Sequence, residues 1–251
     1  MSMFRQKIKI FIDSGRYFVK TIETAEELKE VLTLRYSIFF EELMNKKNFF
    51  KEDKDKFDNI CDHLVIVEKT TNKIVGTYRV NCSLFSKKFY SANEFNIKNI
   101  LKQTGVKVEL GRACIQQEHR KNAVIILLWR GIVEYVKETN AKYLFGVSSA
   151  KELNEERIVE LFYYFKQNHY SENDLRVVPK ISFKISKLNK KIQNSFSTNM
   201  PEVPGLIKFY LKAGSKICGE PAHDRKMKCY DFFTILDMSK ISTSVEEKFL
   251  K

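Results

Sequence analysis

The chain has 251 residues, of which 43% are hydrophobic, and carries a formal net charge of +13 at pH 7. This length and apolar content are enough to bury a real core, so we predict a globular protein with a single domain spanning residues 1–251. The longest unbroken apolar run, residues 123–129, is far shorter than the roughly 20 residues of a membrane-spanning helix, and we expect neither a span nor a signal peptide.

The first half of the chain alternates β-rich and helical patterns. Thr24 and Glu27 form a capping box, in which two side chains satisfy backbone N–H groups at a helix start. A Thr-Thr-Asn run between two β-rich stretches is typical of a hairpin turn. In chain order we predict a strand at residues 16–23, a helix from Thr24 to about residue 43, hairpin strands at 63–69 and 73–81, and an excursion at 86–105 that contains a short helix at 96–102.

The second half continues this alternation. Gly214 is well placed to close a late helix, because glycine readily adopts the left-handed conformation found at helix ends. In chain order we predict a strand at 107–115, a helix at 120–138, a strand at 141–149, a helix at 152–167, a basic segment at 171–200 without a clear assignment, a helix at 205–214, and strands at 216–220 and 230–236. This order predicts a mixed α/β protein with several crossover connections over one sheet.

Cysteine and histidine usage argues against disulfides and metals. The five cysteines are scattered without paired CxxC spacing, which is typical of reduced thiols in a cytoplasmic protein. The four histidines form neither an HExxH motif nor a ligand cluster, so we expect no catalytic metal. We also expect no bound cofactor.

Positive charge is concentrated in two segments, the N-terminal run Arg-Gln-Lys-Ile-Lys and residues 176–191. The second holds six basic residues and no acidic one, which would suit peripheral contact with an anionic membrane at its cytoplasmic face. A solvated lysine face without a partner is the alternative. No RNA-binding motif accompanies the charge, so we expect no nucleic-acid partner.

Five stretches carry a family resemblance. They are LRYSIFFEEL, KDKFDNICDHLVIVE, GTYRVN, ELGRACIQQEHRKNAVIILLWRGI and YLKAGSKICGEPAHDRKMKCYDFFTIL. Together they resemble the branch of the GNAT acyltransferase superfamily that contains ornithine-acyl carrier protein N-acyltransferases, sometimes labelled haemolysin-like. The resemblance extends from about Arg16 to Leu236, and more distantly to acyl-homoserine lactone synthases.

The resemblance implies a GNAT fold, with a mixed central sheet flanked by helices, a splayed strand at the active site and a basic insertion at about 171–200. It also implies transfer of a long acyl chain, with or without a 3-hydroxyl group, from acyl carrier protein to the α-amine of an amino acid. Ornithine is the expected acceptor, a lyso-aminolipid the expected product, and acyl-CoA a less favoured donor. The alternatives are a signal synthase of the acyl-homoserine lactone or N-acyl amino acid type, and a non-catalytic basic RNA- or membrane-binding protein.

Glu109 and Arg112 are the predicted catalytic residues. An amine attacks a thioester only as the free base, and keeping an amine of pKa near 10 neutral at pH 7 costs about 4 kcal/mol. Glu109 could accept that proton directly or through water, and general-base help of this kind contributes roughly 10²- to 10⁴-fold in rate. The alternative is that Glu109 forms a structural ion pair with an arginine.

Residues three apart on a regular strand point to opposite faces, so a shared role for Glu109 and Arg112 requires an irregular strand. Gly111 is a plausible position for a bulge. Backbone N–H groups freed there, at Cys114 and Ile115, could bind the thioester carbonyl. Cys114 as a covalent nucleophile is the sharper alternative, although an apolar strand cysteine is more often part of the core.

The donor is expected to contact the start of the following helix through His119, Arg120, Lys121 and Asn122. GNAT enzymes that use coenzyme A place a Q/R-x-x-G-x-G/A loop here, whose glycines allow the backbone to approach a pyrophosphate. Ala123 and Ile125 occupy those glycine positions. A donor without an adenosine pyrophosphate, such as acyl carrier protein, would not need them. The alternative is ordinary polarity at a helix start.

Upstream residues are expected to build the acceptor side. Arg35 and Phe39 are one helical turn apart and should share a face. The acidic run before the first hairpin strand could bind an ammonium group, and the strands add a histidine and an arginine. By resemblance we predict a substrate-binding role for Arg35, Phe39, Asp55, Asp58, His63 and Arg79, in addition to Cys114 and Ile115. The alternative for Arg79 is a salt bridge within the sheet, and the alternative for His63 is a structural histidine at the start of a strand.

Overall fold

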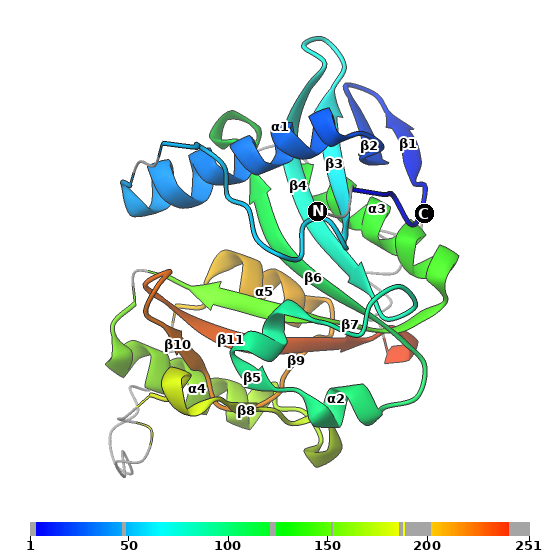
Figure 1. The fold of residues 1–251 in the computed structure, drawn as a ribbon. Helices are drawn as coiled ribbons and strands as arrows, with labels where there is room; N and C mark the ends of the chain where they lie inside the picture. The colour runs from blue at the N-terminus through cyan, green and yellow to red at the C-terminus, as the bar shows by residue number, and fades with distance from the viewer. Residues whose placement is uncertain are drawn as a thin grey trace. The chain divides into compact units, whose positions relative to one another are not determined.

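A computed structural model describes residues 4–46, 49–120, 124–151, 153–185, 188 and 202–240. The chain divides into two compact units (Figure 1). Unit 1 comprises residues 1–87, 106–141 and 247–251, and unit 2 comprises 88–105 and 142–246. The sequence predicted a single domain over residues 1–251. Whether the two units form one domain stays a prediction.

Unit 1 contains an antiparallel sheet. Its strands are β1 (Phe11–Ser14), β2 (Tyr17–Thr21), β3 (Asp62–Glu68), β4 (Lys73–Cys82) and β6 (Val106–Ile115), and they pair in the order β1-β2-β3-β4-β6. The predicted hairpin and the strand at 107–115 are therefore confirmed. Strand β1 was not predicted, because its four residues carry little apolar alternation.

Two helices cover the faces of this sheet (Figure 1). Helix α1 (Ala25–Tyr36) begins at the predicted capping box, where the Thr24 side chain accepts a hydrogen bond from the Glu27 N–H. It continues as a π-helical segment, η1 (Ser37–Glu42), and residues 43 and 44 are also helical, so the helix ends near residue 43 as predicted. The described part of the second helix is α3 (Val124–Thr139).

The helix contacts distinguish the two sheet faces. Apolar residues of α1 pack with Val65 and Val67 of β3, so we call this side the α1 face. Helix α3 lies on the opposite side, where a Cβ added at Gly131 would be 2.7 Å from Val19 and 2.8 Å from Leu64. Glycine is therefore needed at residue 131 for the helix to approach the sheet this closely.

Unit 2 has its own antiparallel pairings. Strand β11 (Cys229–Asp237) pairs with β7 (Ala141–Ala150), β10 (Ala222–Asp224) and β9 (Lys216–Ile217), while β5 (Phe95–Asn96) pairs with β8 (Val178–Pro179). The predicted strands at 141–149 and 230–236 are confirmed, and the one at 216–220 is shorter than expected. Strands β5, β8 and β10 are too short to leave a periodic signal in the sequence.

Among the described residues of unit 2, the α-helices are α2 (Lys98–Lys102), α4 (Glu155–Asn168) and α5 (Gly205–Lys212). All three were predicted, and Gly214 has the positive φ, 98°, of a helix-closing glycine. In the core, Phe145 stacks on Phe233 with ring centroids 5.5 Å apart. Phe165 of α4 meets Phe232 edge-on at 5.1 Å.

The predicted basic insertion at 171–200 is described only in part. Between residues 171 and 185 it forms β8 and two single 3-10 turns, Asn173–Leu175 and Ile181–Phe183. Of residues 186–200, only Leu188 is among the described residues. None of the described helices has both the length and the apolar character that crossing a membrane requires.

Candidate active site

Strand β6 contains an extra residue at the predicted catalytic position. In its pairing with β4, Arg79 lies opposite Gly111 and Thr77 lies opposite Cys114. Two residues of β6, Arg112 and its successor, thus face the single residue Tyr78, which is the definition of a β-bulge. Arg112 has φ of 52°, a left-handed conformation rare in arginine. The predicted strand irregularity is present, one residue beyond Gly111.

The bulge changes which side chains share a sheet face. Residues directly opposite in an antiparallel pair point to the same side, so Glu109 and its partner Asn81 share a face with Arg79. Cys114 is five positions beyond Glu109 and would point away on a regular strand. The extra residue brings it back to the α1 face.

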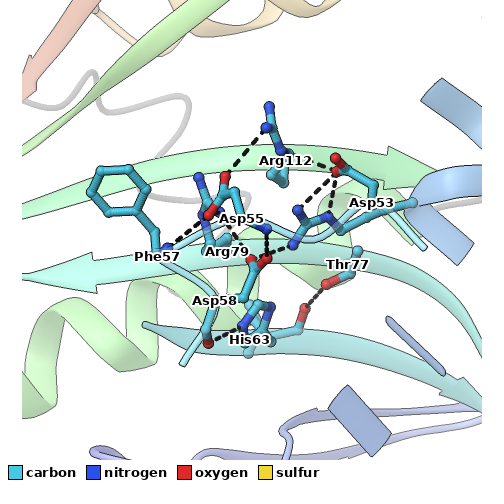
Figure 2. Close-up of polar contacts among 10 residues, drawn as sticks. Asp53, Asp55, Phe57, Asp58, His63, Thr77, Arg79 and Arg112 are labelled. Atoms are coloured by element: carbon cyan, nitrogen blue, oxygen red, sulfur yellow. Dashed lines mark hydrogen bonds and ion pairs between the residues drawn. The ribbon is translucent and has the colours of Figure 1, made fainter. Parts of the chain in front are cut away.

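Three arginines and three aspartates form a buried ion-pair network on this face (Figure 2). They come from helix α1, the loop before β3, strand β4 and the bulge. This Arg–Asp cluster consists of Arg35, Asp53, Asp55, Asp58, Arg79 and Arg112. Its formal charges cancel, which is how a folded protein tolerates so many buried ionic groups.

Asp58 is the central acceptor of the cluster. Its Oδ1 accepts hydrogen bonds from Nη1 of Arg35 at 2.7 Å and from Nη1 of Arg79 at 2.9 Å. Its Oδ2 accepts from the backbone N–H of Asp55 at 2.6 Å. Burial alone would raise the pKa of Asp58, but the guanidinium groups of Arg35 and Arg79 outweigh burial and lower the pKa to about 2. Asp58 is therefore ionised throughout the physiological range.

The remaining two aspartates connect the loop to the bulge. Asp53 Oδ2 accepts from Arg35 Nε at 2.9 Å and lies 3.2 Å from Arg112 Nε. Asp55 accepts from Arg79 Nη1 at 2.7 Å and from Arg112 Nη2 at 3.3 Å. Arg112 contacts the same loop as Arg79, so these ion pairs favour its unusual backbone conformation. Asp55 and Asp58 both pair with arginines here, and their predicted role in binding an ammonium group stays a prediction.

Asp53 is a member of the cluster that the sequence interpretation missed. It is buried between Arg35 and Arg112, and its backbone N–H donates to the carbonyl of Leu32 in α1. The Asp-Lys-Asp-Lys alternation at 53–56 was a usable signal, because alternate positions of an extended segment point the same way. Only the aspartates, at odd positions, contact the arginines.

His63 lies next to the cluster in the core. It is opposite Arg79 in the β3–β4 pairing, and its Nε2 is 2.9 Å from the carbonyl oxygen of Asp58. Burial lowers the pKa of His63 to about 4, and the nearby Arg35 adds to this effect. The imidazole is therefore neutral at pH 7 and acts as an Nε2–H donor that fixes the Asp58 backbone.

Glu109 is 6% exposed and points to the α1 face, on the same strand as the bulge. Phe39 is partly buried and packs against the cluster of apolar residues that α1 forms with the sheet. Cys114 belongs to that same apolar cluster, and burial raises the pKa of its thiol to about 12. A thiol with so high a pKa is a poor nucleophile at pH 7, which favours the core interpretation of Cys114.

The predicted donor-binding residues lie in different surroundings. His119 is buried with its Nδ1 2.9 Å from the Tyr17 hydroxyl, on the α3 face of the sheet. Arg120 donates to both carboxylate oxygens of Glu42, at 2.5 and 2.7 Å, and to the carbonyl of Ile115 at 2.9 Å. Lys121 and Asn122 lie outside the described residues. The donor-binding role of all four stays a prediction.

Unit 2 contains a separate carboxyl group cluster. Glu94, Asp224 and Asp231 are buried, and one oxygen of each lies within 4.8 Å of the others. Within the described part of the chain, this is the one arrangement with the geometry for a metal ion. Burial, together with mutual repulsion among the carboxylates, raises the pKa of Glu94 and of Asp231. Glu94 and Asp231 therefore keep their protons to a higher pH than exposed carboxyl groups do.

Comparisons with known proteins agree with the fold and extend it. Residues 34–130 match the acetyltransferase (GNAT) domain family. The chain is 27% identical to the L-ornithine N(alpha)-acyltransferase of Brucella abortus (strain 2308), over 91% of this chain and 87% of that protein. It is 26% identical to the L-ornithine N(alpha)-acyltransferase of Rhodobacter capsulatus, over 92% and 93%.

Solved structures show the same fold at low identity. The AHL synthase LasI superposes with a TM-score of 0.55 and 13% identity, over 96% of this chain and 95% of LasI. FeeM, an N-acyl amino acid synthase from uncultured soil microbes, gives 0.51 and 10%, over 90% and 94%. The predicted mixed sheet with flanking helices is thus confirmed as a GNAT fold. The chain thus has a GNAT fold and is similar in sequence, over nearly its whole length, to L-ornithine N(alpha)-acyltransferases.

Proposed function

We propose that this protein is an N-acyltransferase that moves a long acyl chain from acyl carrier protein to the α-amine of an amino acid, with ornithine as the acceptor and a lyso-aminolipid as the product. One observation carries the proposal. The similarity to L-ornithine N(alpha)-acyltransferases covers nearly the whole of this chain and of those proteins, so it includes both compact units.

The proposed reaction is attack of the free amine on the thioester carbonyl. The new N–C bond forms, the C–S bond breaks, and the amine's extra proton is taken up as the thiolate leaves. Glu109 is the proposed base, because it is a buried carboxylate on the α1 face beside the bulge. Backbone N–H groups freed from the ladder at the bulge would stabilise the developing oxyanion.

Arg112 is the proposed ligand of the acceptor's α-carboxylate. It is the least buried arginine of the cluster, with 16% of its side chain exposed against 0% for Arg35 and 4% for Arg79. A guanidinium binds a carboxylate through paired hydrogen bonds, which would orient the neighbouring amine. Arg35 and Arg79 would act indirectly, by fixing the aspartates that hold Arg112.

Acyl carrier protein is the proposed donor because of the start of α3. Ala123 and Ile125 occupy the positions where coenzyme A enzymes of this fold carry glycines. A Cβ, and still more an isoleucine side chain, obstructs close approach of a pyrophosphate to the backbone. The net charge of +13 would also raise the encounter rate with an acidic carrier protein.

The test is an acyl-transfer assay with the purified protein. Long-chain acyl-carrier-protein and acyl-CoA thioesters are each incubated with a panel of amino acids, and products are identified by mass spectrometry. We expect N-acylornithine, formed faster from the carrier-protein donor. Equal rates with both donors would overturn the donor assignment, and a different acceptor would overturn ornithine. If no amine is acylated, the proposal as a whole is wrong.

A further inference from the structure

The loop between η1 and β3 is anchored at both ends. At its start, Glu42 forms the two-point ion pair with Arg120. At its far end, Asp53 is held by Arg35 and by the backbone of Leu32. The described residues 43–46 and 49–52 thus lie between two anchored points of unit 1.

Two adjacent phenylalanines in this projection are almost fully exposed. Phe49 is 94% exposed and Phe50 is 81% exposed, and their rings contact each other edge-to-face at 5.7 Å. A single exposed apolar residue needs no explanation, but two neighbouring aromatic rings exposed in water incur a large hydration cost. The pair contrasts with the phenylalanines of both cores, which are buried.

The charges around the pair are positive. Lys46, Lys51, Lys54 and Lys56 are all exposed on the same loop. The loop's three aspartates point inward to the arginines of the Arg–Asp cluster, so their charge is compensated within the protein. Only Glu52 adds negative charge among the outward side chains of residues 49–56. The lysines therefore attract an anionic partner.

We propose that this loop docks the protein on an anionic lipid surface, with Phe49 and Phe50 inserted at the level of the headgroups and the lysines contacting the lipid charges. Phenylalanine is one of the residues that membrane-surface segments bury at the boundary between headgroups and acyl chains, and each lysine near the surface adds attraction to anionic lipid. The docking residues are close in sequence to the candidate site, because the same loop continues into Asp53 and Asp55, which contact Arg112. A role of docking in acyl transfer rests on the proposed function, whereas the binding to lipid does not.

The experiment is co-sedimentation of the full-length protein at low salt with phosphatidylcholine vesicles, with and without phosphatidylglycerol, and without any substrate. We expect binding only to the phosphatidylglycerol vesicles. F49S/F50S should weaken it at least about tenfold, since burial of even one ring is worth about that factor. K46Q/K51Q/K54Q should also weaken it. F11S, which alters an aromatic side chain 59% exposed on β1, is the matched control and should bind normally.

The proposal is wrong if F49S/F50S sediments like the wild type, or if phosphatidylglycerol makes no difference. It is also wrong if I181S, at an 88% exposed residue of the basic segment, abolishes binding while F49S/F50S does not. Normal vesicle binding by F49S/F50S with a raised KM for acyl carrier protein would assign the loop to that protein instead. Equal thermal midpoints check folding, and failure of acyl transfer leaves the vesicle result unaffected.

Discussion

Replacing Asp58 by asparagine should destabilise the protein severely. Asp58 is fully buried and accepts hydrogen bonds from Arg35, Arg79 and the backbone of Asp55. Asparagine is nearly isosteric, so D58N removes a charge while creating no cavity. It leaves two buried guanidinium groups with too little negative charge.

The magnitude follows from the pKa and from the burial. A shift in the pKa of Asp58 from 3.8 to about 2 corresponds to about 2 kcal/mol of folding free energy at neutral pH. Removing one partner of a buried ion pair costs about 3–5 kcal/mol, because the surviving charge stays desolvated. We expect D58N to lower the free energy of unfolding by about 3–5 kcal/mol at pH 7.

Urea denaturation at a series of pH values measures this effect. The pKa of Asp58 is lowered in the folded state, so its contribution is complete above the ordinary carboxyl range and is lost as pH falls through about 4 to about 2. The difference between the wild type and D58N should therefore shrink over that interval. D13N, which removes an exposed partner of Lys69, should cost no more than about 1 kcal/mol. A loss below 1 kcal/mol for D58N, or a difference independent of pH, would refute the reasoning.

Three further substitutions test other parts of the structure. E109Q should lower kcat about 10²- to 10⁴-fold, and full activity would exclude Glu109 as the base. E94Q should stabilise the protein at pH 8 by at least about 1 kcal/mol in urea denaturation. The pKa of Glu94 is raised in the folded state, so the stability of the wild type is full below about pH 4.5 and falls as pH rises, whereas glutamine cannot ionise. An unchanged pH dependence in E94Q would contradict this. G131A should cost about 1–3 kcal/mol in the same assay, since its Cβ would meet Val19 and Leu64 at under 3 Å; a neutral effect would show that the helix can shift.

The sequence was most informative where structure depends on neighbouring residues. The capping box at Thr24 predicts the start of α1, because its hydrogen bonds join residues only three or four positions apart: Glu27 N–H donates to the Thr24 side chain, and Glu23 N–H donates to the Glu27 carboxylate. The Thr-Thr-Asn turn predicts the β3–β4 hairpin for the same reason, and Asn72 there has a positive φ of 53°, which asparagine tolerates. Two-residue strands such as β9 lack any periodicity that a sequence pattern could reveal.

The candidate site was predictable in membership but not in arrangement. Five of its six charged residues were named from the resemblance, and Asp53 was not. The sequence could not show that Asp55 and Asp58 point to arginines, because these partners are 21 to 57 positions away along the chain. Ion pairs across such distances depend on how helix and strands pack.

The sequence by itself determined the alternation of strands and helices, the excess of positive charge and the likeness to ornithine N-acyltransferases, since each is a property of local pattern or composition. Only the tertiary structure decided that the arginines and aspartates of the cluster neutralise one another. It also decided that Arg112 adopts a left-handed backbone, at a cost of about 1–2 kcal/mol that its ion pairs offset. Long-range packing selects such a conformation, because no preference of arginine itself favours it.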